Sequence, residues 1–139
     1  MSHTHIHRVH VEFGDCDPAG IGYFPNFFRW FDAASRHFFV SAGVPPWREL
    51  EKTDGILGTP VVDAGCRFLL PVTYGDDLEV HTSIVEWGTK SFTLKHELRR
   101  GGELLAEGRE VRVFAKRHPD NPAKIVAVPV PELVRKRCG

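Results

Sequence analysis

Asp17 is the side chain in this sequence that is best placed to do chemistry. It lies in the segment Asp15-Cys-Asp-Pro-Ala-Gly, between an alternating apolar stretch and a helix that Pro25 can begin. A carboxylate beside the N–H groups of a helix start could act as a nucleophile or general base, and those N–H groups could polarise a carbonyl. The alternative is that Asp15 and Asp17 only accept Asx-turn hydrogen bonds, which the spacing alone favours.

No other catalytic arrangement competes with this acid. The chain has no Gly-x-Ser-x-Gly motif, and Cys16 has no base at a readable spacing, so we interpret it as a small packed residue. The N-terminal histidines alternate, as on one face of a strand, but we interpret them as a polar chain end. We therefore assign no metal and no cofactor. These histidines are His3, His5, His7 and His10.

Asp32 is the second acid of interest, because its position in the predicted helix allows two interpretations. Its spacing to Arg36 permits an i,i+4 ion pair, which is common on helix surfaces. It also shares a helical stripe with Phe28 and Phe39, an apolar setting in which an acid needs a partner. The first interpretation is structural and the second points to a binding site.

The elements that would position these acids follow from the apolar pattern. Val9, Val11 and Phe13 alternate with polar residues and predict a first strand with one buried face. Pro25 can begin a helix that runs to about residue 42, where Gly43 ends it. The rest of the chain favours strands. The predicted strands cover residues 56–70, 77–87, 91–100, 104–116 and 125–128, and a short helix follows from residue 131.

Together these elements predict an α+β fold, with residues 1–139 as one domain. Phenylalanines occur around much of the long helix, which indicates a helix enclosed by protein. Gly88-Thr89 and Gly101-Gly102 are turn signals of an antiparallel sheet that would wrap around this one long buried helix. Such a small sheet leaves its edges uncovered. A dimer that continues the sheet across two copies would solve this problem.

Composition excludes several classes of function. Lys and Arg together number 18, as do Asp and Glu, so no net field would recruit nucleic acid or an anionic membrane. No stretch is long and apolar enough for a transmembrane helix, and the N-terminus lacks the apolar core of a signal peptide. Cys16, Cys66 and Cys138 show no zinc-ligand spacing and suit reduced thiols, so we expect a cytoplasmic protein.

The run from Glu12 to Trp47 closely resembles the bacterial 4-hydroxybenzoyl-CoA thioesterases, the branch of the hotdog-fold superfamily that uses an aspartate in the strand-to-helix turn. Other acyl-CoA thioesterases of the superfamily usually place a histidine where this chain has Pro25. Further matches continue in order along the chain. They are Gly58-Thr59-Pro60, Glu86-Trp87, Lys90-Ser91-Phe92 and Arg112-Val-Phe-Ala.

This resemblance implies hydrolysis of an aromatic, 4-hydroxybenzoyl-type CoA thioester, in a homodimer that assembles into a homotetramer. Asp17 would be the nucleophile or general base, and the backbone N–H of Phe24 would polarise the thioester carbonyl. Phe24 stands where the relatives carry tyrosine, a change that a backbone donor tolerates. Asp32 would face the phenolic hydroxyl. Tyr23, Phe24 and Trp47 are candidate pocket walls, and Thr59 completes the predicted substrate-binding set.

Coenzyme A carries phosphates, so basic residues should gather at the mouth of the pocket. Lys90 matches a basic residue of the family, but Gly88 and Thr89 stand where the relatives have two arginines. This departure puts tight CoA binding in doubt more than the chemistry. Three further residues could compensate. They are Lys116, Arg117 and Lys124.

Two other functions stay open at this point, and a third is not supported. A thioesterase for a short aliphatic or arylacetyl group would share the same turn. A hotdog hydratase is not supported, because the opening turn and helix carry no Asp-to-His dyad. A non-catalytic acyl-CoA-binding module would bind the ester without turnover, whereas the intact aspartate turn argues for catalysis.

Overall fold

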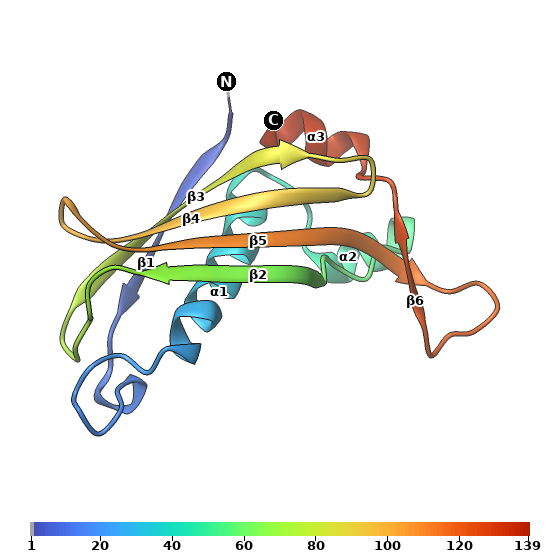
Figure 1. Cartoon of the computed structure of the whole chain (residues 1–139). Coiled ribbons are helices and arrows are strands. Elements are labelled where there is room, and N and C mark those ends of the chain that lie inside the picture. Colours follow the sequence, from blue (N-terminus) through green and yellow to red (C-terminus); the bar gives the residue numbers. More distant parts are fainter. Residues whose placement is uncertain (1) are drawn as a thin grey trace.

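The structure is a computed structural model that describes residues 2–139, and it shows a curved antiparallel sheet with one long helix packed against its inner face (Figure 1). Figure 1 also shows two short helices near one end of the sheet. The elements in chain order are β1 (Thr4–His10), the 3-10 turn η1 (Phe13–Asp15), α1 (Pro25–Ser41), α2 (Trp47–Asp54), β2 (Val61–Phe68), β3 (Asp77–Trp87), β4 (Ser91–Arg100), β5 (Glu103–Arg117), β6 (Ile125–Val128) and α3 (Glu132–Cys138).

The sheet has the order β1-β3-β4-β5-β2, and β6 pairs with the far end of β5. All of these pairings are antiparallel. The predicted hairpins at Gly88-Thr89 and Gly101-Gly102 connect β3 to β4 and β4 to β5. Gly101 has a φ of 62°, a left-handed conformation that glycine adopts at little cost. The predicted α+β arrangement is therefore confirmed.

The long helix α1 lies close to β5 because a glycine faces it. A Cβ atom at Gly108 would lie 2.5 Å from the ring of Phe31, which is closer than carbon atoms can approach. Phe31 is fully buried and also stacks on the ring of His96, with the centroids 5.0 Å apart. The absence of a side chain at position 108 thus lets the helix settle onto the middle of the sheet.

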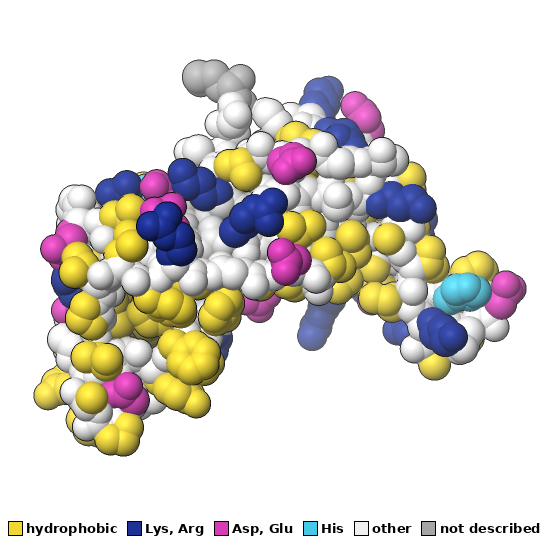
Figure 2. All heavy atoms as spheres, in the orientation of Figure 1, with side chains coloured by type: hydrophobic (Ala, Val, Ile, Leu, Met, Phe, Trp, Pro, Cys, Tyr) yellow, Lys and Arg dark blue, Asp and Glu magenta, His cyan; other side chains and the backbone are white. Residues whose placement is uncertain are grey.

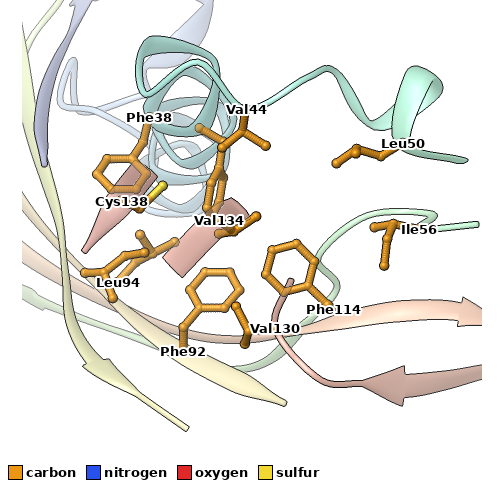
Figure 3. Close-up of a cluster of buried hydrophobic side chains, with 12 residues drawn as sticks. Phe38, Val44, Leu50, Ile56, Phe92, Leu94, Phe114, Val130, Val134 and Cys138 are labelled. Carbon is orange, nitrogen blue, oxygen red and sulfur yellow. The ribbon is translucent and has the colours of Figure 1, made fainter. Parts of the chain in front are cut away.

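The buried hydrophobic residues form two clusters, one toward each end of α1. Figure 3 shows the cluster at the C-terminal end of the helix, where Phe38 and Val44 meet Phe92 and Phe114 of the sheet. The short helices α2 and α3 close this cluster from outside. They do so with Leu50, Val134 and Cys138.

The sequence missed one helix and placed the end of the first strand wrongly. The segment Trp47–Asp54 forms helix α2, which the sequence did not predict because only Leu50 in it is buried and no apolar stripe develops. The first strand ends at His10, so Phe13 lies in η1 and is 77% exposed instead of buried.

One side of α1 is open in the single chain, which differs from the expected enclosed helix. Asp32 and Arg36 are exposed, as is the ring of Phe24. The edge strand β2 lies beside this opening and is exposed on both faces at every residue except Cys66. Figure 2 shows hydrophobic side chains gathered over the loop that leads into α1 and along the lower edge of the sheet. An uncovered strand edge with apolar side chains is typical of a surface that another chain covers.

Candidate active site

Asp17 is held by the turn that precedes α1. Its Oδ1 atom accepts hydrogen bonds from the N–H groups of Ala19 (2.9 Å) and Ile21 (3.4 Å). Asp17 therefore does accept the hydrogen bonds of an Asx turn, but these bonds use only one carboxylate oxygen. In the part of the chain that the structure describes, Oδ2 accepts no hydrogen bond. The turn thus orients the carboxylate and leaves one oxygen free to react.

Asp15 fixes the same turn and is not free. Its Oδ1 accepts from Arg29 Nη2 at 2.6 Å, and its Oδ2 accepts from the backbone N–H of Glu12 at 2.9 Å. Its own backbone carbonyl accepts from the Asn26 side chain at 2.8 Å. Asp15 therefore ties η1 to the first turn of α1, as a turn-forming residue should.

The backbone N–H of Phe24 is the free donor at the start of α1. The neighbouring N–H groups are occupied, since Tyr23 donates to the Asp15 carbonyl (2.9 Å) and Asn26 donates to the Tyr23 carbonyl (2.9 Å). Pro25 has no N–H at all. The Phe24 N–H has no acceptor within residues 2–139. The helix start therefore offers one unoccupied donor at the position that the sequence singled out.

Asp17 and Phe24 open onto the same cavity, which has a volume of about 450 Å³. Its walls are largely apolar and come from the turn, the first residues of α1 and the end of β2. They include Tyr23, Phe27, Phe68 and Leu70. A carboxylate and a free N–H beside an apolar cavity can hold a carbonyl group and attack it.

Asp32 lies in a second cavity of about 430 Å³, together with Trp47 and Thr59. Its ion-pair partner is Arg112, at 2.8 Å between Asp32 Oδ1 and Arg112 Nη2, and not Arg36 as the i,i+4 spacing suggested. The Asp32 side chain is 71% exposed, so the apolar setting expected for it is absent in the single chain. The carboxylate instead stands at the rim of the cavity, on a buried arginine.

The two cavities lie at opposite ends of β2. The Asp32 cavity is lined by Thr59 and Pro60, just before β2 begins, and the Asp17 cavity is lined by Phe68, where β2 ends. One chain therefore does not bring the predicted catalytic and substrate-binding residues into one site. Tyr23 lies with Asp17, whereas Trp47 and Thr59 lie with Asp32.

Three of the four predicted CoA-binding residues belong to the β5–β6 hairpin. Lys116 and Arg117 end β5, and Lys124 precedes β6. Ala115 and Ile125 of the same hairpin line the Asp32 cavity, so this hairpin borders that cavity.

Lys90 is exposed on the turn between β3 and β4, and its carbonyl accepts from the N–H of Phe114 at 3.3 Å. The same turn has a basic neighbour that the sequence did not suggest. Arg135 of α3 donates from Nη2 to the carbonyls of Gly88 and Thr89, the latter at 3.2 Å.

A buried polar network under the Asp32 cavity was not predicted. Arg112 donates from Nη2 to Glu110 Oε2 at 2.8 Å and from Nη1 to the Thr59 carbonyl at 2.8 Å. Glu110 also accepts from His96 Nε2 at 2.6 Å and from the Ser35 hydroxyl. The sequence signal was present, because Gly108, Glu110, Arg112 and Phe114 alternate on the inner face of β5. Two opposite charges at inward positions of a strand require partners.

Glu110 is held as a carboxylate in this network. Burial by itself would raise its pKa, but the hydrogen bond and charge of His96 and the charge of Arg112 outweigh it and lower the pKa to about 2. His96 is fully buried, and its Nδ1 shares a hydrogen bond of 2.8 Å with the Thr82 hydroxyl. The network therefore extends from the rim of the cavity to the middle of the sheet.

In the described residues, no three His, Cys, Asp or Glu side chains gather in a way that could hold a metal ion. Cys16, Cys66 and Cys138 are free. None of the helices within residues 2–139 combines the length and apolar composition needed to cross a membrane.

Comparison with known proteins places this chain among thioesterases. Residues 11–137 match the family described as the thioesterase-like superfamily. The chain is 44% identical, over 100% of both chains, to the 4-hydroxybenzoyl-CoA thioesterase of Pseudomonas sp. (strain CBS-3). The sequence-based resemblance is therefore confirmed.

Solved structures agree. The crystal structure of a mutant 4-hydroxybenzoyl CoA thioesterase complexed with 4-hydroxybenzoyl CoA superposes with a TM-score of 0.92 at 38% identity, over 99% of this chain and 100% of that one. A gentisyl-coenzyme A thioesterase superposes with a TM-score of 0.80 at 36% identity, over 96% and 98% of the two chains. The predicted hotdog fold is confirmed.

Proposed function

The chain belongs to the thioesterase-like superfamily and is an acyl-CoA thioesterase, and we propose that it hydrolyses an aromatic, 4-hydroxybenzoyl-type CoA thioester to the free acid and CoA. One observation carries the chemistry. Asp17, whose Oδ2 accepts no hydrogen bond within residues 2–139, and Phe24, whose N–H has no acceptor there, line the same largely apolar cavity. The two relatives described above, whose names give hydroxylated aromatic acyl groups, support the substrate class.

In this proposal the thioester carbonyl oxygen accepts the Phe24 N–H, which stabilises the negative charge that develops during attack. Asp17 then acts in one of two ways. It attacks the carbonyl carbon, the C–S bond breaks, CoA leaves as the thiol, and water hydrolyses the acyl-aspartyl anhydride. Alternatively, Asp17 takes a proton from a water molecule that attacks the carbonyl directly. Both routes give the same products.

We propose a homodimer in which β2 of one copy pairs with β2 of the other. Antiparallel pairing about a two-fold axis sets the start of one β2 against the end of its partner. The Asp32 cavity, at the start of β2, would then meet the Asp17 cavity of the other copy, at the end of β2. The exposed faces of β2 support this assembly. A complete site would combine both copies, and two such dimers would pair into a tetramer.

The acyl ring would then extend from Asp17 of one copy toward Asp32 of the other. Tyr23 and Trp47 would form walls of the ring site, with Thr59 beside Trp47. The hydroxyl of the ring would donate to Asp32, whose Oδ2 accepts no hydrogen bond within residues 2–139. Lys90 and the β5–β6 hairpin, with Lys116, Arg117 and Lys124, would face the CoA phosphates.

The cytoplasm stays our predicted location. Burial raises the pKa of the Cys66 thiol to about 11 and that of Cys138 to about 12, so both stay protonated at neutral pH. Free, protonated thiols fit a reducing compartment.

Steady-state kinetics on four esters tests the proposed function. We expect 4-hydroxybenzoyl-CoA to give the highest kcat/KM, followed by benzoyl-CoA, with phenylacetyl-CoA and butyryl-CoA lower. A preference for phenylacetyl-CoA or butyryl-CoA would favour a thioesterase with another acyl group. Tight binding of all four without CoA release would indicate a non-catalytic binding module.

Asp32 should set the preference for the ring hydroxyl. A carboxylate left without its donor in a closed site costs about 1–3 kcal/mol, so wild type should prefer 4-hydroxybenzoyl-CoA over benzoyl-CoA by at least about 10-fold in kcat/KM. Asp32→Ala and Asp32→Leu should narrow this ratio, mainly by losing activity on the hydroxylated ester. Equal treatment of the two esters by wild type would mean that Asp32 only serves as the partner of Arg112.

Lys90 should act on CoA binding. Its ammonium is exposed, and removing one exposed phosphate contact costs about 1 kcal/mol or less, so Lys90→Ala should raise KM several-fold with kcat nearly unchanged. The effect should shrink at high salt because screening weakens such pairs. Lys95→Ala, which removes an exposed lysine from β4, is the matched control. A large loss of kcat in Lys90→Ala would place this lysine in the chemistry.

A further inference from the structure

Arg112 connects three segments of the chain that meet at the Asp32 cavity. It joins Asp32 of α1 to the Thr59 carbonyl in the segment before β2, although Arg112 itself belongs to β5. The arginine is 7% exposed, whereas the carboxylate that it holds is 71% exposed. An exposed ion pair usually contributes little, because both side chains must be ordered. Here one partner is already ordered by the protein.

Arg112 is ordered by the buried side chain of Glu110. Glu110 Oε2 accepts from the same Nη2 that Asp32 uses, at 2.8 Å, and Glu110 is itself fixed by His96 and Ser35. All three are buried. The guanidinium therefore cannot swing away with Asp32, and the planar fork fixes where the bound carboxylate oxygen lies.

This arrangement also decides what Asp32 can do. Two carboxylates share one guanidinium, and Asp32 is the carboxylate at the exposed end of the chain of contacts. An ionised carboxylate only accepts hydrogen bonds. Asp32 Oδ1 accepts from Arg112, so Oδ2 is the oxygen that is left to accept a hydrogen bond from a ligand.

We propose that Arg112 is a specificity-determining positioning residue, which holds Asp32 as a fixed acceptor so that the site takes acyl rings bearing a hydrogen-bond donor and rejects those bearing only an acceptor or an anion. This inference rests on the proposed function, because it assumes that Asp32 meets the acyl ring. It extends that function by defining a substrate class: rings with hydroxyl or amino donors.

Wild-type enzyme tests the class without any substitution. The substrates are benzoyl-CoA and its 4-hydroxy, 4-amino, 4-methoxy and 4-carboxy derivatives, each kcat/KM being divided by the rate at which hydroxylamine cleaves the same ester at a pH where the ring hydroxyl keeps its proton. This division removes the intrinsic electronic effect of the substituent. We expect the normalised kcat/KM of the hydroxy and amino esters to exceed that of benzoyl-CoA. The normalised kcat/KM of the methoxy and carboxy esters should fall below it. A methoxy ester that equals the hydroxy ester, or an amino ester that falls below benzoyl-CoA, would overturn the acceptor assignment.

Arg112→Lys tests the role of the arginine. Lysine keeps the charge but lacks the fork that holds Asp32, Glu110 and Thr59 together. We expect the ratio of kcat/KM for 4-hydroxybenzoyl-CoA over benzoyl-CoA to fall at least about five-fold, because activity on the hydroxylated ester falls more than activity on benzoyl-CoA. Arg109→Lys is the matched control, because Arg109 is exposed on the outer face of the same strand. If Arg112 served stability alone, the substitution would lower kcat/KM for both esters by the same factor.

The same substitution in the Asp32→Ala background shows whether Arg112 acts through Asp32. There we expect Arg112→Lys to leave the ratio unchanged, since residues that act as a unit are not additive. If Arg112→Lys lowered the ratio equally in the wild-type and Asp32→Ala backgrounds, the proposal would be overturned. If Arg112→Lys does not fold, Glu110→Gln should lower the ratio in the same direction, and a folded Glu110→Gln with the wild-type ratio counts against the proposal. Failure of the proposed function differs from these results, because wild type would then show no hydroxyl preference at all.

Discussion

Replacing Asp17 with asparagine should lower kcat by at least about a thousandfold, which corresponds to about 4 kcal/mol of activation free energy. Asparagine retains an oxygen that can accept from the N–H groups of Ala19 and Ile21, so the turn should keep its shape. It loses the negative charge that attacks the carbonyl or takes a proton from water. The fall should appear in kcat and in kcat/KM alike.

The measurement is CoA release from 4-hydroxybenzoyl-CoA under saturating and limiting ester, with thermal unfolding and circular dichroism as checks on folding. Asp54→Asn provides the control, because Asp54 is an exposed carboxylate at the end of α2. A folded Asp17→Asn protein with near wild-type turnover would remove Asp17 from the mechanism. The remaining candidate chemistry would then be attack by unactivated water on a carbonyl that the Phe24 N–H polarises.

Glu110 should make the protein sensitive to acid. Its pKa in the folded chain is about 2, against an ordinary value of 4.5, and this difference corresponds to roughly 3 kcal/mol of folding free energy. Because the folded-state pKa is the lower one, this stabilisation is complete above about pH 4.5. It is lost progressively as the pH falls toward about 2. Protonation removes the charge that His96 and Arg112 hold.

Urea unfolding of wild type and Glu110→Gln at pH 6, 4 and 3 measures this contribution. We expect the wild-type free energy of unfolding to fall more steeply between pH 6 and pH 3 than that of Glu110→Gln, since glutamine cannot titrate. Glu51→Gln is the control, because Glu51 is exposed on α2 and should keep the wild-type slope. Parallel curves for wild type and Glu110→Gln would show that this carboxylate is not specially stabilised in the folded chain.

The sequence predicted the sheet because each hairpin has its own local signal, such as Gly101-Gly102, and because the strands alternate clearly. It predicted Asp17 for a similar reason: the turn, the acid and the helix start are neighbours along the chain. Helix α2 was missed because the surrounding fold, and not an apolar stripe of its own, stabilises it. Leu50 is its one buried residue, and the half-buried Trp47 also packs against the core.

The buried network was harder to predict for a physical reason. Glu110 and Arg112 are adjacent on one face of β5, but their partners His96 and Asp32 come from other elements, and only the folded sheet brings them together. The division of the site into two cavities is also invisible in the sequence. It depends on which ends of β2 lie near α1, a property of the topology and not of any motif.

The donor at position 24 belongs to the main chain, and this has an evolutionary consequence. Ordinary substitutions at Phe24 change a wall of the cavity but cannot delete its N–H group, because every residue except proline supplies one. In the proposed mechanism, mutation at this position can therefore alter which acyl groups fit beside the helix start, while the N–H group that would polarise the carbonyl is inherited unchanged. At this position the side chain affects which acyl groups fit, whereas the main-chain N–H serves the chemistry. Natural selection can therefore change the substrate range here without removing the donor that the chemistry needs.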